Sequence, residues 1–145
     1  MIYKGHDISL DKEDLYLLDH YVWYIHKSGK KKYLRGYKKN CRQDGLVYMH
    51  RLILGFPKEV DHINGNGLDN KRRNLRSCNR SQNNANRLDD GSKGVHFENS
   101  TKRFRAIIHY NKKRINIGRF NTFAEAKNAY NTKSKELFRE FSCVS

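Results

Sequence analysis

Residues 60–83 read VDHINGNGLDNKRRNLRSCNRSQN, a stretch dense in asparagine. Eight asparagines lie between Asp61 and Asn86, and apolar residues are interleaved with them. That spacing favours an ordered, turn-rich segment over a low-complexity one. The stretch ends in Asn79-Arg-Ser-Gln82, which has the residues of a helix capping box. We therefore predict a strand, a loop and a short helix, in that order.

A strand, a loop and a helix in this order would bring Asp61, His62 and Asn83 towards one centre. Carboxylate and amide oxygens are hard ligands that suit Mg²⁺ or Mn²⁺ rather than zinc. A histidine beside such a cation can activate water, because its pKa lies near neutral pH. Neighbouring strand residues point to opposite faces, so Asp61 and His62 share a centre only if the backbone turns there. Taken alone, an adjacent Asp-His pair is more often structural than catalytic.

The sequence before this stretch is rich in strand-forming residues. Two turn-forming pairs, Ser28-Gly29 and Asp44-Gly45, separate its apolar runs. Those runs predict three strands, at residues 21–25, 32–37 and 46–49. Trp23 is expected in the core of this small sheet. A short helix or turn is expected at residues 10–18, and a short helix or strand at 51–56, ending before the single proline.

Alternation of apolar and polar residues is clearest in the C-terminal third. It predicts three antiparallel strands, at residues 94–97, 103–110 and 114–117, with a hairpin turn at 110–113. Thr122 and Glu125 form a capping box that begins a helix after the third strand. We expect sheet and helix to pack through one apolar face, made of Val95, Phe97, Phe104, Ala106, Ile108, Tyr110, Ile115 and Ile117 on the sheet and Phe123, Ala126, Tyr130 and Leu137 on the helix.

The opposite face of the same sheet is basic, and no second layer is expected to cover it. Ile107 shares this face with six polar residues: His96, Arg103, Arg105, His109, Arg114 and Asn116. An ordinary solvated surface is one interpretation. Because these side chains converge in the most basic third of the chain, we favour contact with DNA.

The whole chain has 145 residues and a formal net charge of +15, which indicates a polyanionic partner. The net charge is +5 over residues 1–57, +2 over 58–90 and +8 over 91–145, so the asparagine-rich stretch lies in the least charged segment. No apolar run approaches the roughly 20 residues of a membrane-spanning helix, and no signal peptide is recognisable, so we expect a cytoplasmic protein. The odd number and wide spacing of the cysteines indicate free thiols at Cys41, Cys78 and Cys143.

The asparagine-rich stretch resembles the HNH nuclease motif of homing endonucleases. The matching segments are Asp61-His-Ile-Asn-Gly-Asn66, Leu68-Asp-Asn70, Asn74-Leu75 and Gln82-Asn83, preceded by His50-Arg51-Leu52. The resemblance implies a ββα-metal site that holds one divalent cation, Mg²⁺ or Mn²⁺, and hydrolyses a DNA phosphodiester. It implies that Asp61 and Asn83 ligate the metal and that His62 is the general base. Asn74 would orient the histidine or brace the loop.

The C-terminal third resembles the plant Apetala-two (ethylene-response-factor) DNA-binding domain. The matching segments are Ser92-Lys-Gly-Val95, Phe104-Arg-Ala106, Ile117-Gly-Arg-Phe120, Ala124-Glu-Ala126 and Ala129-Tyr130. The resemblance implies the same three-stranded sheet on one helix, with the sheet in the major groove of double-stranded DNA. The plant pattern has arginine where this chain has His96 and His109, and tryptophan where it has Asn116. We therefore do not expect the plant target sequence.

Together these features predict an α+β protein: a β-rich HNH nuclease domain with a ββα-metal motif at residues 1–88, and an Apetala-two-like DNA-binding domain at 92–145, joined by a linker around 87–93. Nucleases that join these two modules are familiar from phages. We expect a metal-dependent endonuclease that nicks duplex DNA, is a monomer rather than a dimer, and acts in the host cytoplasm if phage-encoded. Arg51 is expected to add a DNA contact. The alternatives are a DNA-binding regulator with a decayed nuclease module and an RNA-binding basic protein, which the absence of an aromatic-rich sheet motif disfavours.

Overall fold

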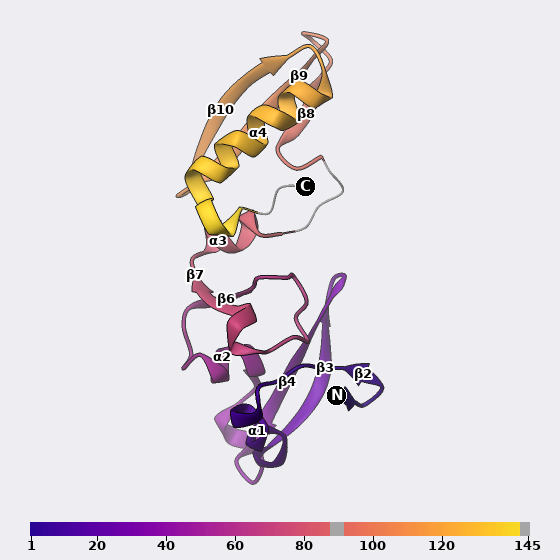
Figure 1. Ribbon diagram of the computed structural model, residues 1–145, viewed down its shortest axis with the longest axis vertical. Coiled ribbons are helices and arrows are strands. Elements are labelled where there is room, and N and C mark those ends of the chain that lie inside the picture. Colours follow the sequence, from indigo (N-terminus) through magenta and orange to yellow (C-terminus); the bar gives the residue numbers. More distant parts are fainter. Residues whose placement is uncertain (88–91, 143–145) are drawn as a thin grey trace. The chain divides into compact units, whose positions relative to one another are not determined.

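The computed structural model describes residues 1–87 and 92–142 and is a mixed α+β protein with small antiparallel sheets. The chain divides into two compact units, Met1–Asn79 and Arg80–Ser145 (Figure 1). This packing boundary precedes the expected linker because α3 (Arg80–Ala85) contacts α4 (Phe123–Phe138) and η4 (Arg139–Phe141) of the second unit. The linker itself lies mostly outside the described residues. The division into two functional domains stays a prediction.

The first unit is organised around a three-stranded antiparallel sheet in the order β3-β4-β5. β3 (Tyr21–Ser28) and β4 (Lys31–Lys38) confirm the first two predicted strands, and β5 (Val47–Tyr48) is shorter than predicted. Met49, expected in the third strand, instead begins α2 (Met49–Ile53). The other elements before residue 59 are β1 (Ile2–Tyr3), β2 (His6–Asp7), η1 (Lys12–Asp14), α1 (Tyr16–His20) and η2 (Arg42–Asp44).

The core of this unit contains the single tryptophan of the chain, as predicted. Trp23 is fully buried, and its Nε1–H donates to the Leu17 carbonyl at 2.8 Å, so the polar atom of the indole is satisfied. Gly36 lies opposite Trp23 on β4, where a Cβ atom would approach indole Cε3 to 2.7 Å. The buried hydrophobic residues around it are Ile8, Leu17, Leu34, Met49, Ile53, Val60, Leu68 and Leu75.

The asparagine-rich stretch forms a separate two-stranded sheet of this unit. β6 (Glu59–His62) pairs antiparallel with β7 (Leu75–Cys78), and η3 (Arg72–Asn74) precedes β7. Inside the connecting loop, Asn64 Oδ1 accepts from the Asn66 amide at 2.9 Å, and Asn66 Oδ1 accepts from the Leu68 amide at 3.1 Å. These short-range bonds are why so many asparagines produce order rather than low complexity.

The elements β6, β7 and α3 follow one another along the chain in the order of the predicted ββα motif. α3 begins at Arg80, directly after Asn79, where the capping-box pattern predicts a helix to start. Since α3 belongs to the second unit, its arrangement with the β6–β7 hairpin as a metal-binding motif stays a prediction.

The second unit is a three-stranded antiparallel sheet, in the order β10-β9-β8, with α4 lying along one face (Figure 1). β8 (Val95–Glu98), β9 (Arg103–Tyr110) and β10 (Lys113–Phe120) confirm the three predicted strands. Asn111 and Lys112 have φ angles of 47° and 65°, as a two-residue hairpin turn requires.

Two of the residues predicted for the interior of this unit, Phe97 and Phe123, are exposed, which contradicts the prediction. Phe97 is 50% exposed, whereas Leu137 is partly buried. Phe97 lies opposite Phe104 in the sheet. The Phe104 ring contacts Phe123 in the first turn of α4. The helix therefore begins beside Phe104 and does not extend over Phe97. Phe123 itself is 41% exposed. The buried stripe of the helix has a regular spacing of four and consists of Ala126, Tyr130, Ser134 and Phe138.

None of the helices in the described residues is long and apolar enough to cross a membrane. Cys41 and Cys78 are free thiols, as predicted, while Cys143 lies outside the described residues. Burial, together with the nearby carboxylates of Asp61 and Glu59, raises the pKa of Cys78 to about 11. That thiol therefore stays protonated at neutral pH.

Candidate functional site

Asp61 lies on β6 with its side chain buried, 4% exposed. Its Oδ2 atom accepts a hydrogen bond from Nε of Arg76 at 2.9 Å and lies 2.8 Å from Nη2 of the same guanidinium as an ion pair. Arg76 is the residue directly opposite on β7, and its side chain is 15% exposed, so the pair is largely removed from water. A charge-assisted hydrogen bond of this kind fixes the orientation of the carboxylate.

His62 is also buried, but it has different partners from its neighbour Asp61. Its Nε2–H donates to Oδ1 of Asn70 at 3.4 Å, and its ring lies 5.9 Å from the ring of Tyr33. Separate partners are what alternating side chains on a strand predict. Burial lowers the pKa of His62, against the opposing effects of Asn70 and Asp61. The imidazole is therefore neutral at neutral pH.

His50 is a residue of this site for which no role was predicted. It lies on α2, 8% exposed, with its ring edge-to-face on His62 at 4.9 Å and stacked on Tyr48 at 5.3 Å. Burial lowers its pKa to about 3, aided by His62 and by Arg51. Its Nδ1 atom has no hydrogen-bond partner among the described residues. The sequence feature that could have identified His50 is the His50-Arg51-Leu52 segment that precedes the stretch resembling the nuclease motif.

Asn74 braces the loop and makes no hydrogen bond to the histidine. Its Oδ1 accepts from the Asn64 amide at 3.0 Å, and its Nδ2 donates to the Asp69 carbonyl at 2.7 Å. The amide that does contact His62 is Asn70, which is completely buried and was quoted in the motif without a role. Of the two tasks expected of Asn74, only loop bracing matches its contacts.

The remaining predicted residues of the nuclease site lie elsewhere. Asn83 is in α3 and so belongs to the second unit, whereas Asp61 belongs to the first. Arg51 is in α2, partly buried, and its Nε–H donates to the Pro57 carbonyl at 3.3 Å. The predicted metal-binding role of Asn83 and the predicted DNA contact of Arg51 both stay predictions.

A separate group of acidic side chains on η1 is explained by an arginine. Asp14 is 1% exposed, and its two carboxylate oxygens accept from Arg72 Nη2 at 2.7 Å and Nε at 3.0 Å. The Arg72 amide also donates to Asp11 at 2.8 Å, and Glu13 pairs with the same guanidinium. These contacts join η1 to η3, and we assign this group a structural role.

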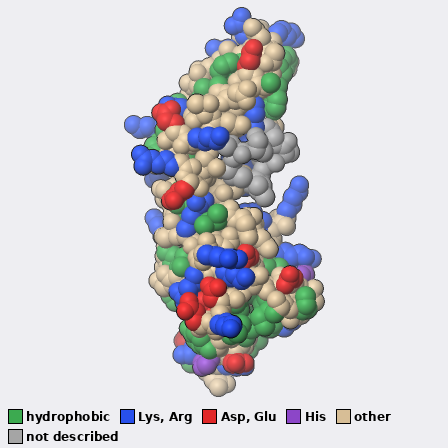
Figure 2. Space-filling view, viewed as in Figure 1, with side chains coloured by type: hydrophobic (Ala, Val, Ile, Leu, Met, Phe, Trp, Pro, Cys, Tyr) green, Lys and Arg blue, Asp and Glu red, His purple; other side chains and the backbone are tan. Residues whose placement is uncertain are grey.

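The second candidate region is the sheet face opposite α4. Strand register places Arg105 beside His96 on one side and Arg119 on the other, and His109 beside Arg114. The predicted residues that are exposed there are His96, Arg103, His109, Arg114 and Asn116. Ile107, predicted on this face, is 7% exposed. On the face of the molecule that Figure 2 shows, Lys and Arg side chains are spread over both units.

Arg119 joins this face although strict alternation from Arg114 and Asn116 would point it towards the helix. The β9–β10 register shifts between Asn116 and Gly118, and the extra residue reverses the side-chain phase of the strand beyond it. Arg119 consequently pairs with Arg105 across the sheet. A glycine inside a strand is a sequence signal for such a bulge, and Gly118 supplied it.

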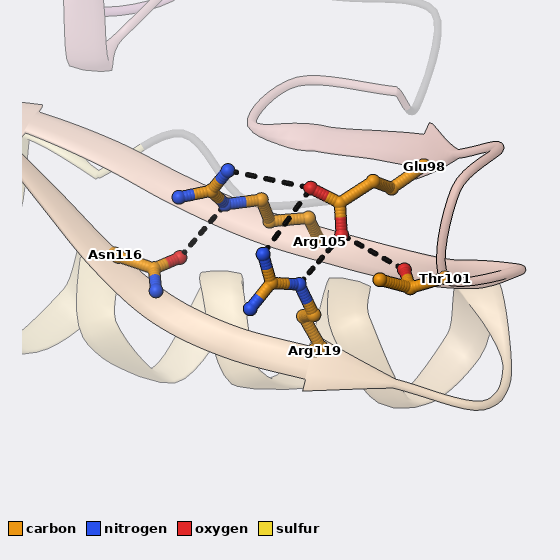
Figure 3. Close-up of polar contacts among 5 residues, drawn as sticks. All are labelled: Glu98, Thr101, Arg105, Asn116 and Arg119. Atoms are coloured by element: carbon orange, nitrogen blue, oxygen red, sulfur yellow. Dashed lines mark hydrogen bonds and ion pairs between the residues drawn. The ribbon is translucent and has the colours of Figure 1, made fainter.

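Glu98 organises the arginines at this end of the face (Figure 3). Its carboxylate accepts from Arg119 Nε and Nη2, at 2.5 and 3.3 Å, and more weakly from Arg105 Nη1 at 3.5 Å. Thr101 donates its hydroxyl to the same carboxylate at 2.8 Å. On the far side of Arg105, the Nε–H donates to Asn116 Oδ1 at 3.1 Å. The hydrogen bonds from Arg119 and Thr101 lower the pKa of Glu98 to about 2.

Comparison with known proteins identifies one relevant relative. No family model matches the sequence, and no solved structure matches the chain. The chain is 31% identical over 143 residues to an uncharacterized HNH endonuclease of Acanthamoeba polyphaga mimivirus, an alignment that covers 93% of this chain and 71% of the relative. Because that similarity extends over nearly the whole sequence, including the Asp61-His62 segment, this chain belongs to the HNH endonuclease family.

Proposed function

We propose that this protein is a metal-dependent endonuclease that hydrolyses phosphodiester bonds of duplex DNA at a preferred site. The observation that carries the proposal is the pair at the end of β6. A carboxylate fixed by Arg76 adjoins a buried imidazole whose surroundings keep it neutral. A neutral imidazole can accept a proton, which an imidazolium cannot. Membership of the HNH endonuclease family supports a nuclease.

In this proposal His62 is the general base. With Nε2–H donating to Asn70, the lone pair of the neutral ring is on Nδ1, which takes the proton from the attacking water. Contacts with His50 and Tyr33 hold the ring in one orientation, and Asn74 holds the loop that carries Asn70. General-base catalysis of this kind accounts for about 10²–10⁴-fold in rate.

Asp61 and Asn83 are the proposed ligands of one divalent cation, Mg²⁺ or Mn²⁺. Carboxylate and amide oxygens suit such a hard cation. Arg76 donates its Nε–H to Oδ2 of Asp61 and so holds the carboxylate in place. When bound, the cation would supply Lewis-acid stabilisation of the negative charge that develops on the scissile phosphate.

The basic sheet face of the second unit is the proposed contact surface for duplex DNA. Exposed arginine and histidine side chains there can reach phosphates and base edges, and the net charge of +15 favours a polyanion. Arg51 is proposed as a further contact. A monomer has one such site and would cut one strand per binding event. We place the activity in the cytoplasm of a host cell, where it would meet its DNA substrate.

Incubation of the full chain with supercoiled plasmid tests this proposal. We expect conversion to open circles with Mg²⁺ or Mn²⁺ and none with EDTA. His62→Ala should lower the nicking rate at least about 100-fold while duplex binding in a mobility-shift assay is retained. His20→Ala, which removes an exposed histidine of the same unit, is the matched control and should cleave normally.

Two outcomes would contradict the assignment. Full nicking by the His62→Ala variant would remove His62 from the role of base. Tight duplex binding without cleavage in any divalent metal would instead identify a DNA-binding regulator with an inactive nuclease module.

A further inference from the structure

Glu98 is a carboxylate on the basic sheet face, where a surface that binds DNA by charge alone would not be expected to carry one. The other polar side chains of the face are arginines, histidines and an asparagine, and Glu98 lies on β8 directly opposite Arg103 of β9. A negative charge in such a position repels the phosphate backbone. Glu98 therefore weakens attraction by charge alone, and its presence needs another explanation.

Glu98 fixes the orientation of the Arg105 and Arg119 side chains. Its two oxygens both accept from Arg119, and one of them also accepts from Arg105, so two long side chains share a single anchor (Figure 3). Asn116 holds Arg105 from the other side through the Nε–H. The Glu98 side chain is 23% exposed and is also bonded to Thr101, so the anchor is itself fixed. Two arginines that would otherwise be mobile are thus held in defined positions.

Both guanidinium groups retain donors after these bonds are made. A guanidinium has five N–H groups. Arg105 uses Nε and Nη1, and Arg119 uses Nε and Nη2. Within the described residues, Nη2 of Arg105 and Nη1 of Arg119 have no partner. The side chains are 27% and 43% exposed, so these donors are accessible to a ligand.

We propose that Glu98 holds Arg105 and Arg119 as fixed donor pairs that recognise guanine bases in the major groove, which makes Glu98 a positioning residue for sequence recognition. This inference rests on the proposed function, namely that this face binds duplex DNA. Arginine donating to O6 and N7 of guanine is a base contact whose strength depends on a fixed direction of approach. A phosphate contact needs no such fixed geometry. An anchor that reduces charge but fixes direction therefore suits base edges better than the backbone.

The test is a selection from duplex DNA with a randomised central segment, using the full chain in EDTA so that the DNA is not cut. The wild type should enrich a motif that contains one or more G·C pairs. Glu98→Gln and Arg119→Lys should lose preference at the same pairs, by roughly tenfold or more at each. Arg119→Lys keeps the positive charge and loses the fork, so its affinity for non-selected DNA should stay close to that of the wild type.

The matched control is Glu136→Gln, which removes a carboxylate of α4 that pairs with Lys133 on the same helix. It should enrich the wild-type motif unchanged. If Glu98→Gln also enriches the unchanged motif, or tightens binding equally to all sequences, then Glu98 acts only through its charge and the inference is wrong while the proposed function stands. If the wild type binds no duplex DNA, the inference and the proposed contact surface for duplex DNA are wrong together.

Discussion

The two units each contain an arginine–carboxylate cluster, and the two clusters differ in their access to water. In the first unit, Asp61 is 4% exposed and Arg76 15%, so the ion pair between them is largely removed from water. In the second unit, Glu98 is 23% exposed and Arg119 43%, and two arginines share one carboxylate. The buried cluster is electrically balanced, whereas the exposed one retains a net positive charge and accessible donors.

The same pair of residue types, arginine and carboxylate, can therefore serve two purposes. Around Asp61 the low exposure also keeps His62 and His50 neutral, which suits proton transfer. Around Glu98 the exposure leaves arginine donors accessible for an external ligand. The comparison predicts that the first unit is sensitive to acid and the second to changes in the packing of its sheet.

The largest expected effect is on the packing of the second unit, through Gly94→Ala. Gly94 has a φ of +75°, and a Cβ atom there would lie 2.0 Å from Cε2 of Tyr130 on α4. Backbone strain and overpacking together should cost about 3 kcal/mol of unfolding free energy. Helix signal in circular dichroism should melt at a lower temperature, while fluorescence of Trp23, the single tryptophan, should report an unchanged first unit.

Gly5→Ala is the matched control for backbone strain. Gly5 also has a positive φ, +76°, but no atom lies within 4 Å of the added Cβ. It should lower the unfolding free energy of the first unit by only about 1 kcal/mol, measured by Trp23 fluorescence. Equal losses in the two variants would mean that overpacking against Tyr130 adds nothing to the backbone strain at Gly94.

Local patterns were sufficient to predict most of the fold. Strand-forming runs between turn-forming pairs located β3 and β4, and alternation located β8, β9 and the first part of β10. The Thr122 capping box located the start of α4. The errors were at places where tertiary position decides exposure. Phe97 fits the inward phase of its strand, but the helix begins too far along to cover it. Sequence alternation specifies a face of a strand and says nothing about how far the covering layer extends.

The candidate sites were predictable only in part, for two physical reasons. Motif residues gave Asp61 and His62, but the contacts that define their chemistry come from residues distant in sequence, such as His50. In the sheet, the bulge before Gly118 reversed the phase of β10 and brought Arg119 to the basic face. A one-residue insertion changes every position beyond it, and alternation alone cannot detect it.

The next effect is acid sensitivity of the first unit. The pKa of His50 is lowered from 6.5 to about 3, and that of His62 is also lowered, in each case chiefly by burial. Below pH 6.5 the unfolded chain binds protons that the folded chain does not, so stability falls as pH falls. His50 should contribute up to about 1.4 kcal/mol per pH unit to this loss, and His62 should add to the slope in the same direction. Urea unfolding followed by Trp23 fluorescence between pH 7.5 and 5 measures the slope.

His50→Gln should reduce that slope, since the buried histidine with the pKa of about 3 is gone. His20→Gln, at an exposed histidine of α1, should leave it unchanged. A slope that is the same in all three proteins would show that the stability of the first unit does not depend on keeping these imidazoles neutral.

A smaller effect is expected for single charges on the basic sheet face. Arg114→Ala removes an exposed arginine of β10 beside His109. If Arg114 contacts a phosphate, the slope of log affinity against log salt concentration should fall by about 1. Lys133→Ala lowers the net charge equally but lies on α4, where Lys133 pairs with Glu136. A salt titration that gives both variants the same reduced slope would indicate attraction by overall charge, without a defined contact face.

The smallest expected effect is on the first turn of α4, through Thr122→Ala. Thr122 Oγ1 accepts from the Glu125 amide at 3.2 Å, and the Glu125 carboxylate accepts from the Thr122 and Asn121 amides at 3.3 and 3.2 Å. Loss of the cap should cost about 1 kcal/mol, and Thr122→Ser should restore most of it. Chemical unfolding by circular dichroism should detect the loss, whereas the Trp23 transition should not move. A shift of both signals by the same amount would mean that the two units unfold as one. The units would then differ in the chemistry of their arginine–carboxylate clusters but not in their stability.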